Sequence, residues 1–284
     1  MESSDKICMH QHRDFGGVIN AAFDFIRMNG LMILKMLAVF AIPFLAVGFA
    51  IFFYSISGEQ SHVALTFFAI FLITAGISLF NFSIYAFMDN YMKFENPQDI
   101  RIKDIWKTLL SRIGAFIGTA IVAGLIVGIA SMFMTFPGII LYTYLSFVLP
   151  VIVFEKGGTG KAISRSFQLV GGKFWYTLGL STLLFSIEFM FWFLIDAPMY
   201  LAKEFGIIKA YSITHIDFTL AGWDYAIMAI YTFIQYSMFS MIWIVTAVAF
   251  SFHYFSVRED REHIGMRMEI EKFGTHSDED EYDY

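Results

Sequence analysis

The residue of this sequence best suited to chemistry is an ionisable side chain in the middle of an apolar segment. Glu188 lies in the run SIEFMFWF, about fourteen residues into an apolar stretch that begins at Phe174. At 1.5 Å per residue this is roughly 21 Å along a helix, near the centre of a bilayer. A carboxyl group at that depth is costly, so it is a candidate for proton transfer or substrate binding.

Glu188 also has a purely structural interpretation. Gln235 lies about twelve residues into the last apolar stretch, is expected at a similar depth, and could hydrogen-bond Glu188. Such a bond ties two membrane helices together without any role in transport. The sequence leaves both interpretations open.

Three further polar residues lie within apolar stretches or at their ends. Lys35 begins the first stretch, where its amine can reach the headgroup layer. Asp89 ends the second stretch at a similar depth and could pair with Lys35, while Asn81 lies deeper and is expected to hydrogen-bond a neighbouring helix. Anchoring and helix packing are the roles predicted for these three residues.

The patterns that would support hydrolytic, metal or haem chemistry are missing from the sequence. HExxH, GxSxG and GxxxxGK[ST] are absent, and no histidine falls in the middle of an apolar stretch. His253 comes closest, near the end of the last stretch, which argues against a haem held by histidines. We therefore predict no enzymatic activity, no cofactor and no metal site.

These residues are carried by a mostly apolar chain. Of the 284 residues, 57% are hydrophobic and 15% charged, whereas soluble domains are nearer half apolar and a quarter charged. Six stretches are long enough to cross a bilayer, so the predicted fold class is an all-α polytopic integral membrane protein. The stretches are 31–54, 63–91, 113–134, a fourth that follows the turn at 135–138 and ends near 154, 174–200 and 223–255.

Three amphipathic segments with basic polar faces precede the first, third and fifth spans. They cover 15–29, 99–112 and 157–174, and helices of this kind lie in the headgroup layer. The chain is therefore predicted to consist of three units, each an interfacial helix followed by a transmembrane hairpin. The cations expected to contact anionic lipid headgroups are Lys103, Lys107, Arg112, Lys161, Arg165 and Lys173.

Lysine and arginine are distributed unevenly between the two sides that six spans would create. The termini and the connectors on their side hold sixteen of them, and the alternate connectors hold two. The positive-inside rule then predicts that both termini and all three interfacial helices are cytoplasmic. We expect a flexible tail at 1–14, a single six-span domain at 15–255 and a charged acidic tail at 256–284.

The run GTGKAISRSFQLVGGKFWYTLGL resembles a segment of a bacterial membrane-domain family. The resemblance lies at Ala162, Ser166-Phe167, Leu169-Val170 and Lys173-Phe174-Trp175, and the opening FGGVINAAFDFIRMNG is similar to the first helix of the family. The family includes the membrane domain of some glycerophosphoryl diester phosphodiesterases and stand-alone six-span proteins of unknown function. The resemblance implies a bacterial inner-membrane protein without the catalytic domain, because that domain is a separate soluble barrel.

The sequence favours a non-enzymatic membrane scaffold or assembly partner. The alternative is a transporter or lipid-handling protein that uses Glu188. Expected partners are the lipid bilayer and the anionic headgroups of the cytoplasmic leaflet. A protein partner stays open, and nucleic acid is not expected because the chain lacks a basic footprint.

Overall fold

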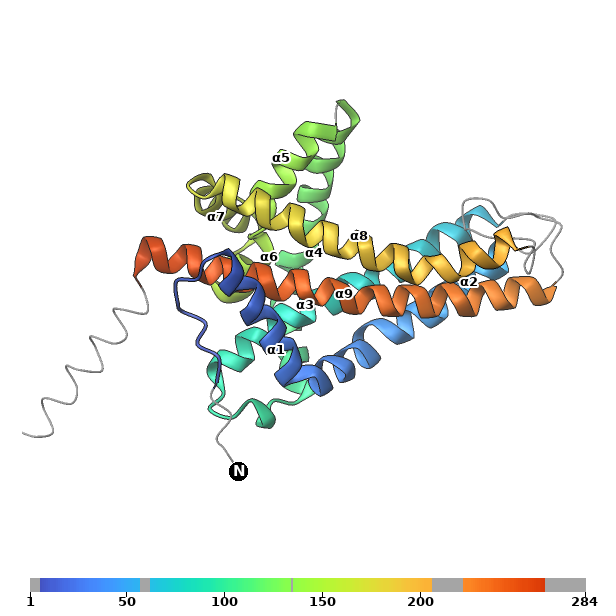
Figure 1. Cartoon of the computed structure of the whole chain (residues 1–284), viewed down its shortest axis with the longest axis horizontal. Helices are drawn as coiled ribbons and strands as arrows, with labels where there is room; N and C mark the ends of the chain where they lie inside the picture. Colours follow the sequence, from blue (N-terminus) through green and yellow to red (C-terminus); the bar gives the residue numbers. More distant parts are fainter. Residues whose placement is uncertain (1–5, 57–61, 134, 206–221, 264–284) are drawn as a thin grey trace, which may run out of the picture. The chain divides into compact units, whose positions relative to one another are not determined.

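The computed structural model describes residues 6–56, 62–133, 135–205 and 222–263, and their regular structure is helical with no strand. Six helical stretches among them are long and apolar enough to cross a membrane. This confirms the predicted all-α, six-span membrane fold (Figure 1). The elements are α1 (Phe15–Met36), η1 (Leu37–Ala41), α2 (Ile42–Ile56), α3 (Val63–Lys93), η2 (Pro97–Asp99), α4 (Ile102–Phe133), α5 (Thr135–Leu145), α6 (Val148–Phe154), α7 (Thr159–Gly171), α8 (Phe174–Glu204) and α9 (Gly222–Glu262).

Contacts divide the chain into two compact units. Unit 1 consists of Met1–Met28, Met88–Leu180 and Val248–Tyr284, and unit 2 consists of Asn29–Phe87 and Ser181–Ala247. Unit 1 therefore holds α4 to α7, and unit 2 holds η1 and α2. The other long helices contribute residues to both units.

Within unit 2, the helix around Pro43 continues through a π-turn. Pro43 has no N–H to donate to the carbonyl of Val39, and its ring crowds that carbonyl. The helix widens over Leu37–Ala41, where the Ile42 N–H donates to the carbonyl of Leu37. A π-turn of this kind absorbs the distortion that a proline causes in a membrane helix.

Helices α2 and α3 of unit 2 approach each other closely at two glycines. A β-carbon on Gly48 would lie 2.6 Å from Cγ1 of Ile73, and one on Gly76 would lie 2.5 Å from Cβ of Phe44. Only glycine fits at such separations, because the neighbouring atoms belong to packed side chains. Small residues thus allow the dense helix contact that stabilises membrane helices.

Two of the three predicted interfacial helices are the first turns of longer helices. Residues 15–29 continue into the rest of α1, and residues 102–112 continue into α4. Neither junction contains a proline, and a single glycine inside a helix costs only about 1 kcal/mol, so the helix has no reason to end. Only α7 is a separate amphipathic helix, so the structure does not show three equivalent units.

The fourth predicted span is broken into α5 and α6. Pro150 is the cause, because it lacks the N–H that would bond the carbonyl of Ser146 and its ring crowds that carbonyl. Ser146 and Phe147 lie in a turn between the two helices. Backbone groups at this turn need partners from outside the helix, since an apolar span offers no water to supply them.

Helix α7 packs against protein within unit 1. It contacts α4, α5 and α6, and its buried residues are Ala162, Ser166, Leu169 and Val170. Helical spacing groups Ile163, Phe167 and Val170 on one face, but Ile163 is half-buried and Phe167 is exposed. The difference arises because the buried face of α7 meets the turn between α5 and α6, which needs the hydroxyl of Ser166.

Candidate functional site: the polar cluster around α7 and the end of α9

Ser166 supplies the missing partners at the break between α5 and α6. Its hydroxyl donates to the carbonyl of Tyr144 at 2.6 Å and accepts from the N–H of Phe147 at 3.2 Å. Ser166 is fully buried. One side chain therefore satisfies a donor and an acceptor that the broken helix leaves without intrahelical partners.

Glu155, directly after α6, begins a network of charged side chains. It accepts hydrogen bonds from Nε of Arg165 at 3.0 Å and from the hydroxyl of Tyr254 at 2.8 Å. Its side chain is only 12% exposed, and that of Arg165 is 25% exposed. Charge-assisted bonds with this little exposure are stronger than surface pairs.

Glu262 at the end of α9 completes the network. Arg258 donates to Glu262 Oε2 from Nε at 3.0 Å and from Nη2 at 2.9 Å, and Arg165 pairs with the other oxygen of Glu262. The guanidinium of Arg165 thus bridges two carboxylates, one after α6 and one on α9. The network fixes α6, α7 and the end of α9 to one another within unit 1.

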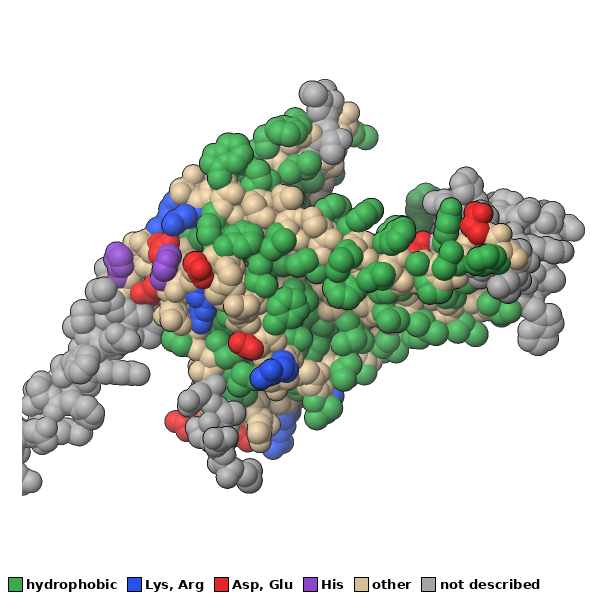
Figure 2. Space-filling model, in the orientation of Figure 1, with side chains coloured by type: hydrophobic (Ala, Val, Ile, Leu, Met, Phe, Trp, Pro, Cys, Tyr) green, Lys and Arg blue, Asp and Glu red, His purple; other side chains and the backbone are tan. Residues whose placement is uncertain are grey.

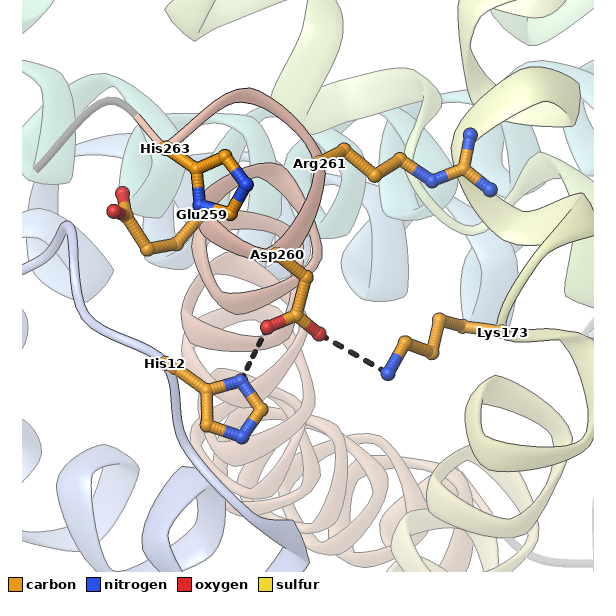
Figure 3. A pocket seen from close by; sticks show the side chains of 6 residues that line it. All are labelled: His12, Lys173, Glu259, Asp260, Arg261 and His263. Atoms are coloured by element: carbon orange, nitrogen blue, oxygen red, sulfur yellow. Dashed lines mark ion pairs between the residues drawn. The ribbon is translucent and has the colours of Figure 1, made fainter. Parts of the chain in front are cut away.

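A hollow of about 550 Å³ lies beside this network (Figure 3). Asp260 points between His12 and Lys173 and pairs with both, at 2.5 Å to Nδ1 of His12 and 3.0 Å to Nζ of Lys173. Arg261 extends away from them and donates to the carbonyl of Gln168 at 2.8 Å. That carbonyl belongs to the last turn of α7, where a cation also complements the helix dipole.

Figure 2 shows acidic, basic and histidine side chains grouped where α9 ends, with many hydrophobic side chains along the long helices and further charged side chains near the lower edge of the view. The end of α9 therefore carries a polar face, where Arg258 pairs with Glu262, Asp260 pairs with His12 and Lys173, and Arg261 donates to the carbonyl of Gln168. Chemically, this arrangement holds segments together.

The N-terminal segment also belongs to this cluster. Residues 6–14 were expected to form part of a flexible tail, but Arg13 N donates to Ser256 Oγ at 3.0 Å and Ile7 N donates to the hydroxyl of Tyr91 at 3.1 Å. The ring of His10 lies 4.9 Å from that of Phe255. Burial and the nearby charge of Arg258 lower the pKa of His10, which favours its neutral form.

The six cations predicted to contact lipid headgroups fall into two groups. Arg165 and Lys173 are paired with carboxylates of the protein, which the sequence analysis did not anticipate. The charges of the other four meet no carboxylate among the described residues. Lys103, Lys107 and Lys161 are exposed, and Arg112 is half-buried.

In unit 2, the intramembrane carboxylates bond differently from the prediction. Glu188 accepts a hydrogen bond from the hydroxyl of Thr246, and Gln235 donates to Asp196 at 2.8 Å. The expected bond between Glu188 and Gln235 is therefore wrong. Gln235 meets α8 at Asp196, eight residues further along the helix than Glu188, so depths counted from the two span ends do not give the register of α8 against α9.

The remaining polar candidates have local partners or face outward. Asp89 forms an ion pair with Lys93 one turn further along α3, so its predicted pairing with Lys35 is replaced by a local one. Asn81 donates to the carbonyl of Ile77 at 3.0 Å in its own helix, where a neighbouring helix was expected. Lys35 is exposed.

Sequence reasoning missed Ser166, Glu155, Tyr254 and the carboxylates at the end of α9 as site residues. A proline inside the fourth span was a usable signal, because it implies a break whose free backbone groups some polar side chain must satisfy.

In the part of the chain that the structure describes, no group of three or more His, Cys, Asp or Glu is placed to hold a metal ion. Comparison with protein-family models, with characterised proteins and with solved structures finds no match to this chain.

Proposed function

We propose that this multi-pass membrane protein is a non-enzymatic scaffold or assembly partner. The observation that supports the proposal is that charged side chains of the protein pair with one another across helices. Glu155, Arg165, Arg258 and Glu262 are paired with one another and join three helices. Charges used in this way maintain one architecture, and a scaffold needs a fixed shape more than it needs a reactive group.

The intramembrane carboxylates support the same proposal. Glu188 and Asp196 of α8 bond Thr246 and Gln235 of α9, and Tyr231 of α9 donates to the carbonyl of Ile195 at 3.0 Å. Residue numbers rise along α8 as they fall along α9, so the two helices run antiparallel. These bonds lock a helix pair within unit 2, as polar side chains do in membrane bundles.

Glu188 provides the experiment that separates a scaffold from a transporter. Glutamine can still accept the bond from Thr246, so Glu188→Gln should leave the free energy of unfolding within about 0.5 kcal/mol of the parent. Glu188→Leu should lower it by roughly 1 kcal/mol, the scale of one interhelical bond. Unfolding in mixed micelles measures both values, with Thr246→Val as the matched control for the same bond.

Growth of a strain that depends on the protein supplies the second half of the test. A scaffold tolerates the loss of the titrating proton, so the Glu188→Gln variant should complement fully. Failure to complement at unchanged stability would overturn the scaffold proposal in favour of proton-coupled transport.

We further propose that both termini lie on the cytoplasmic side of a bacterial cytoplasmic membrane. The uneven distribution of Lys and Arg supports this orientation. The bonds of Arg13 to Ser256 support a common side for the N-terminal segment and the end of α9. We also propose kinship with the membrane part of the phosphodiesterase family, on the basis of the resemblance at the residues around Ser166.

Reporter fusions test this orientation. Fusions at Gln98 and Gly158 should report the cytoplasm, and a fusion at Gly58 should report the opposite side. The reason is that sixteen Lys and Arg residues are predicted on the side of the termini and only two on the other side. Alkaline phosphatase and green fluorescent protein at each position form complementary readouts. Phosphatase activity at Gly158 would contradict the proposed topology.

A further inference from the structure

A second hollow in unit 1 is lined by several cations that form no ion pair among the described residues. It has a volume of about 340 Å³, within the range of small-ligand sites. Three segments contribute to it: the end of α3, the first turns of α4, and the end of α6 with the turn that follows. The lining residues are Asp89, Asn90, Lys93, Phe94, Asp104, Lys107, Thr108, Ser111, Arg112, Val153 and Lys156.

The two carboxylates of this hollow already have partners. Asp89 is paired with Lys93, and Asp104 accepts a hydrogen bond from the backbone N–H of Arg101 at 3.0 Å. Among the residues that the structure describes, no carboxylate lies within ion-pair distance of Lys107, Arg112 or Lys156. The hollow is therefore lined by four cations and two carboxylates, which leaves a net charge of +2, and Lys107, Arg112 and Lys156 form no ion pair among the described residues.

Lys156 ends α6 in a left-handed conformation. Its φ is 55°, in the left-handed region that glycine adopts without strain. The N–H of Gly157 then donates to the carbonyl of Val151 at 3.3 Å, as in the Schellman motif that ends many helices. This turn places Lys156 among the residues that line the hollow.

Neutral donors complete the lining of the hollow. Asn90, itself buried, donates from Nδ2 to Oγ1 of Thr108 at 3.1 Å. Because Thr108 accepts this bond, its own O–H remains able to donate to a ligand. A guanidinium, two amines and a hydroxyl around one cavity match the oxygens of a phosphate group.

We propose that this hollow binds a phosphate group through Lys107, Arg112 and Lys156. The group belongs either to the headgroup of an anionic lipid or to a soluble phosphate compound. The proposal goes beyond the scaffold function and does not depend on it, since it concerns residues outside the ion network and outside unit 2.

Calorimetric titration of the full-length protein in an uncharged maltoside detergent tests the proposal. The probes are dioctanoyl phosphatidylglycerol, sodium phosphate at constant ionic strength, and dioctanoylglycerol, which has the same chains but no phosphate. Saturable binding of phosphatidylglycerol alone assigns the site to a lipid headgroup. Binding of sodium phosphate that competes with the lipid assigns it to a phosphate group of either source. Binding of neither, or equal binding of dioctanoylglycerol, would overturn the proposal.

Variants tie the binding to the hollow. Each of three single substitutions should weaken binding roughly tenfold or more, the usual effect of losing one charge-assisted bond. The substitutions are Lys107→Gln, Arg112→Gln and Lys156→Gln. Lys103→Gln with Lys161→Gln is the matched control, because these exposed cations do not line the hollow, and it should bind as the parent does. The pair Lys107→Arg and Lys156→Arg keeps the charge and should retain binding, which separates lost affinity from misfolding. Undiminished binding in the triple Gln variant would contradict the assignment.

Discussion

Replacing Ser166 by alanine is expected to lower the free energy of unfolding by about 2–4 kcal/mol. The substitution removes one hydroxyl but leaves two buried backbone groups without partners, the carbonyl of Tyr144 and the N–H of Phe147. Each unsatisfied buried group costs roughly 1–3 kcal/mol. The turn lies within an apolar span where water is scarce, so solvent cannot replace the lost bonds. Unfolding in mixed micelles measures the change.

Ser164→Ala is the matched control for this prediction. Ser164 lies two residues earlier on α7 and is exposed, so its replacement should change the free energy of unfolding by less than about 0.5 kcal/mol. Equal effects of the two substitutions would show that the hydroxyl of Ser166 has no special role at the break.

A double-mutant cycle with Pro150 tests the cause of the break. Alanine at 150 restores the N–H that can bond the carbonyl of Ser146, so the helix can close and give Tyr144 and Phe147 intrahelical partners. Ser166→Ala should then cost at least about 1 kcal/mol less in the Pro150→Ala background than in the parent. Strict additivity would contradict the dependence of Ser166 on Pro150.

The six spans could be predicted from the sequence because they depend on a local property. Length and apolar composition of a stretch decide whether a helix can cross a bilayer, and no knowledge of neighbours is needed. Helix ends are less predictable. Residues 15–29 and 102–112 have the amphipathic pattern of separate helices, but nothing at 29–31 or 112–114 stops the helix.

Pairing between helices could not be predicted, because it depends on register. The expected Glu188–Gln235 bond rested on depths counted inward from the starts of the two spans, but Gln235 meets Asp196, eight residues further along α8 than Glu188. Glu155 meets partners 10, 99 and 103 positions away along the chain, and Arg165 meets Glu262 97 positions away. A single sequence shows each of these charges but not which carboxylate each cation meets.

Glu155→Ala should lower the free energy of unfolding by about 2–3 kcal/mol. Glu155 accepts bonds from Arg165 and Tyr254 and lies 3.8 Å from Arg258, so its loss leaves two guanidiniums with less counter-charge. Breaking one side of a fully buried ion pair costs about 3–5 kcal/mol. The smaller value expected here follows from the exposure of Arg165, 25% of its side chain, which lets water screen the remaining charge. Unfolding in mixed micelles at low salt measures the effect.

Two comparisons decide whether that loss comes from the network. Glu95→Ala removes an exposed carboxylate of unit 1 and should change stability by less than about 0.5 kcal/mol. The central pair can also be removed as a whole, with Glu155→Leu and Arg165→Leu in one variant. This double change should cost less than the sum of the two single changes, because each single change leaves the charge of the other residue behind and the double change does not. A double variant that is as unstable as that sum would mean that the two residues act separately. The ion pair would then not be what holds α7 to the end of α6.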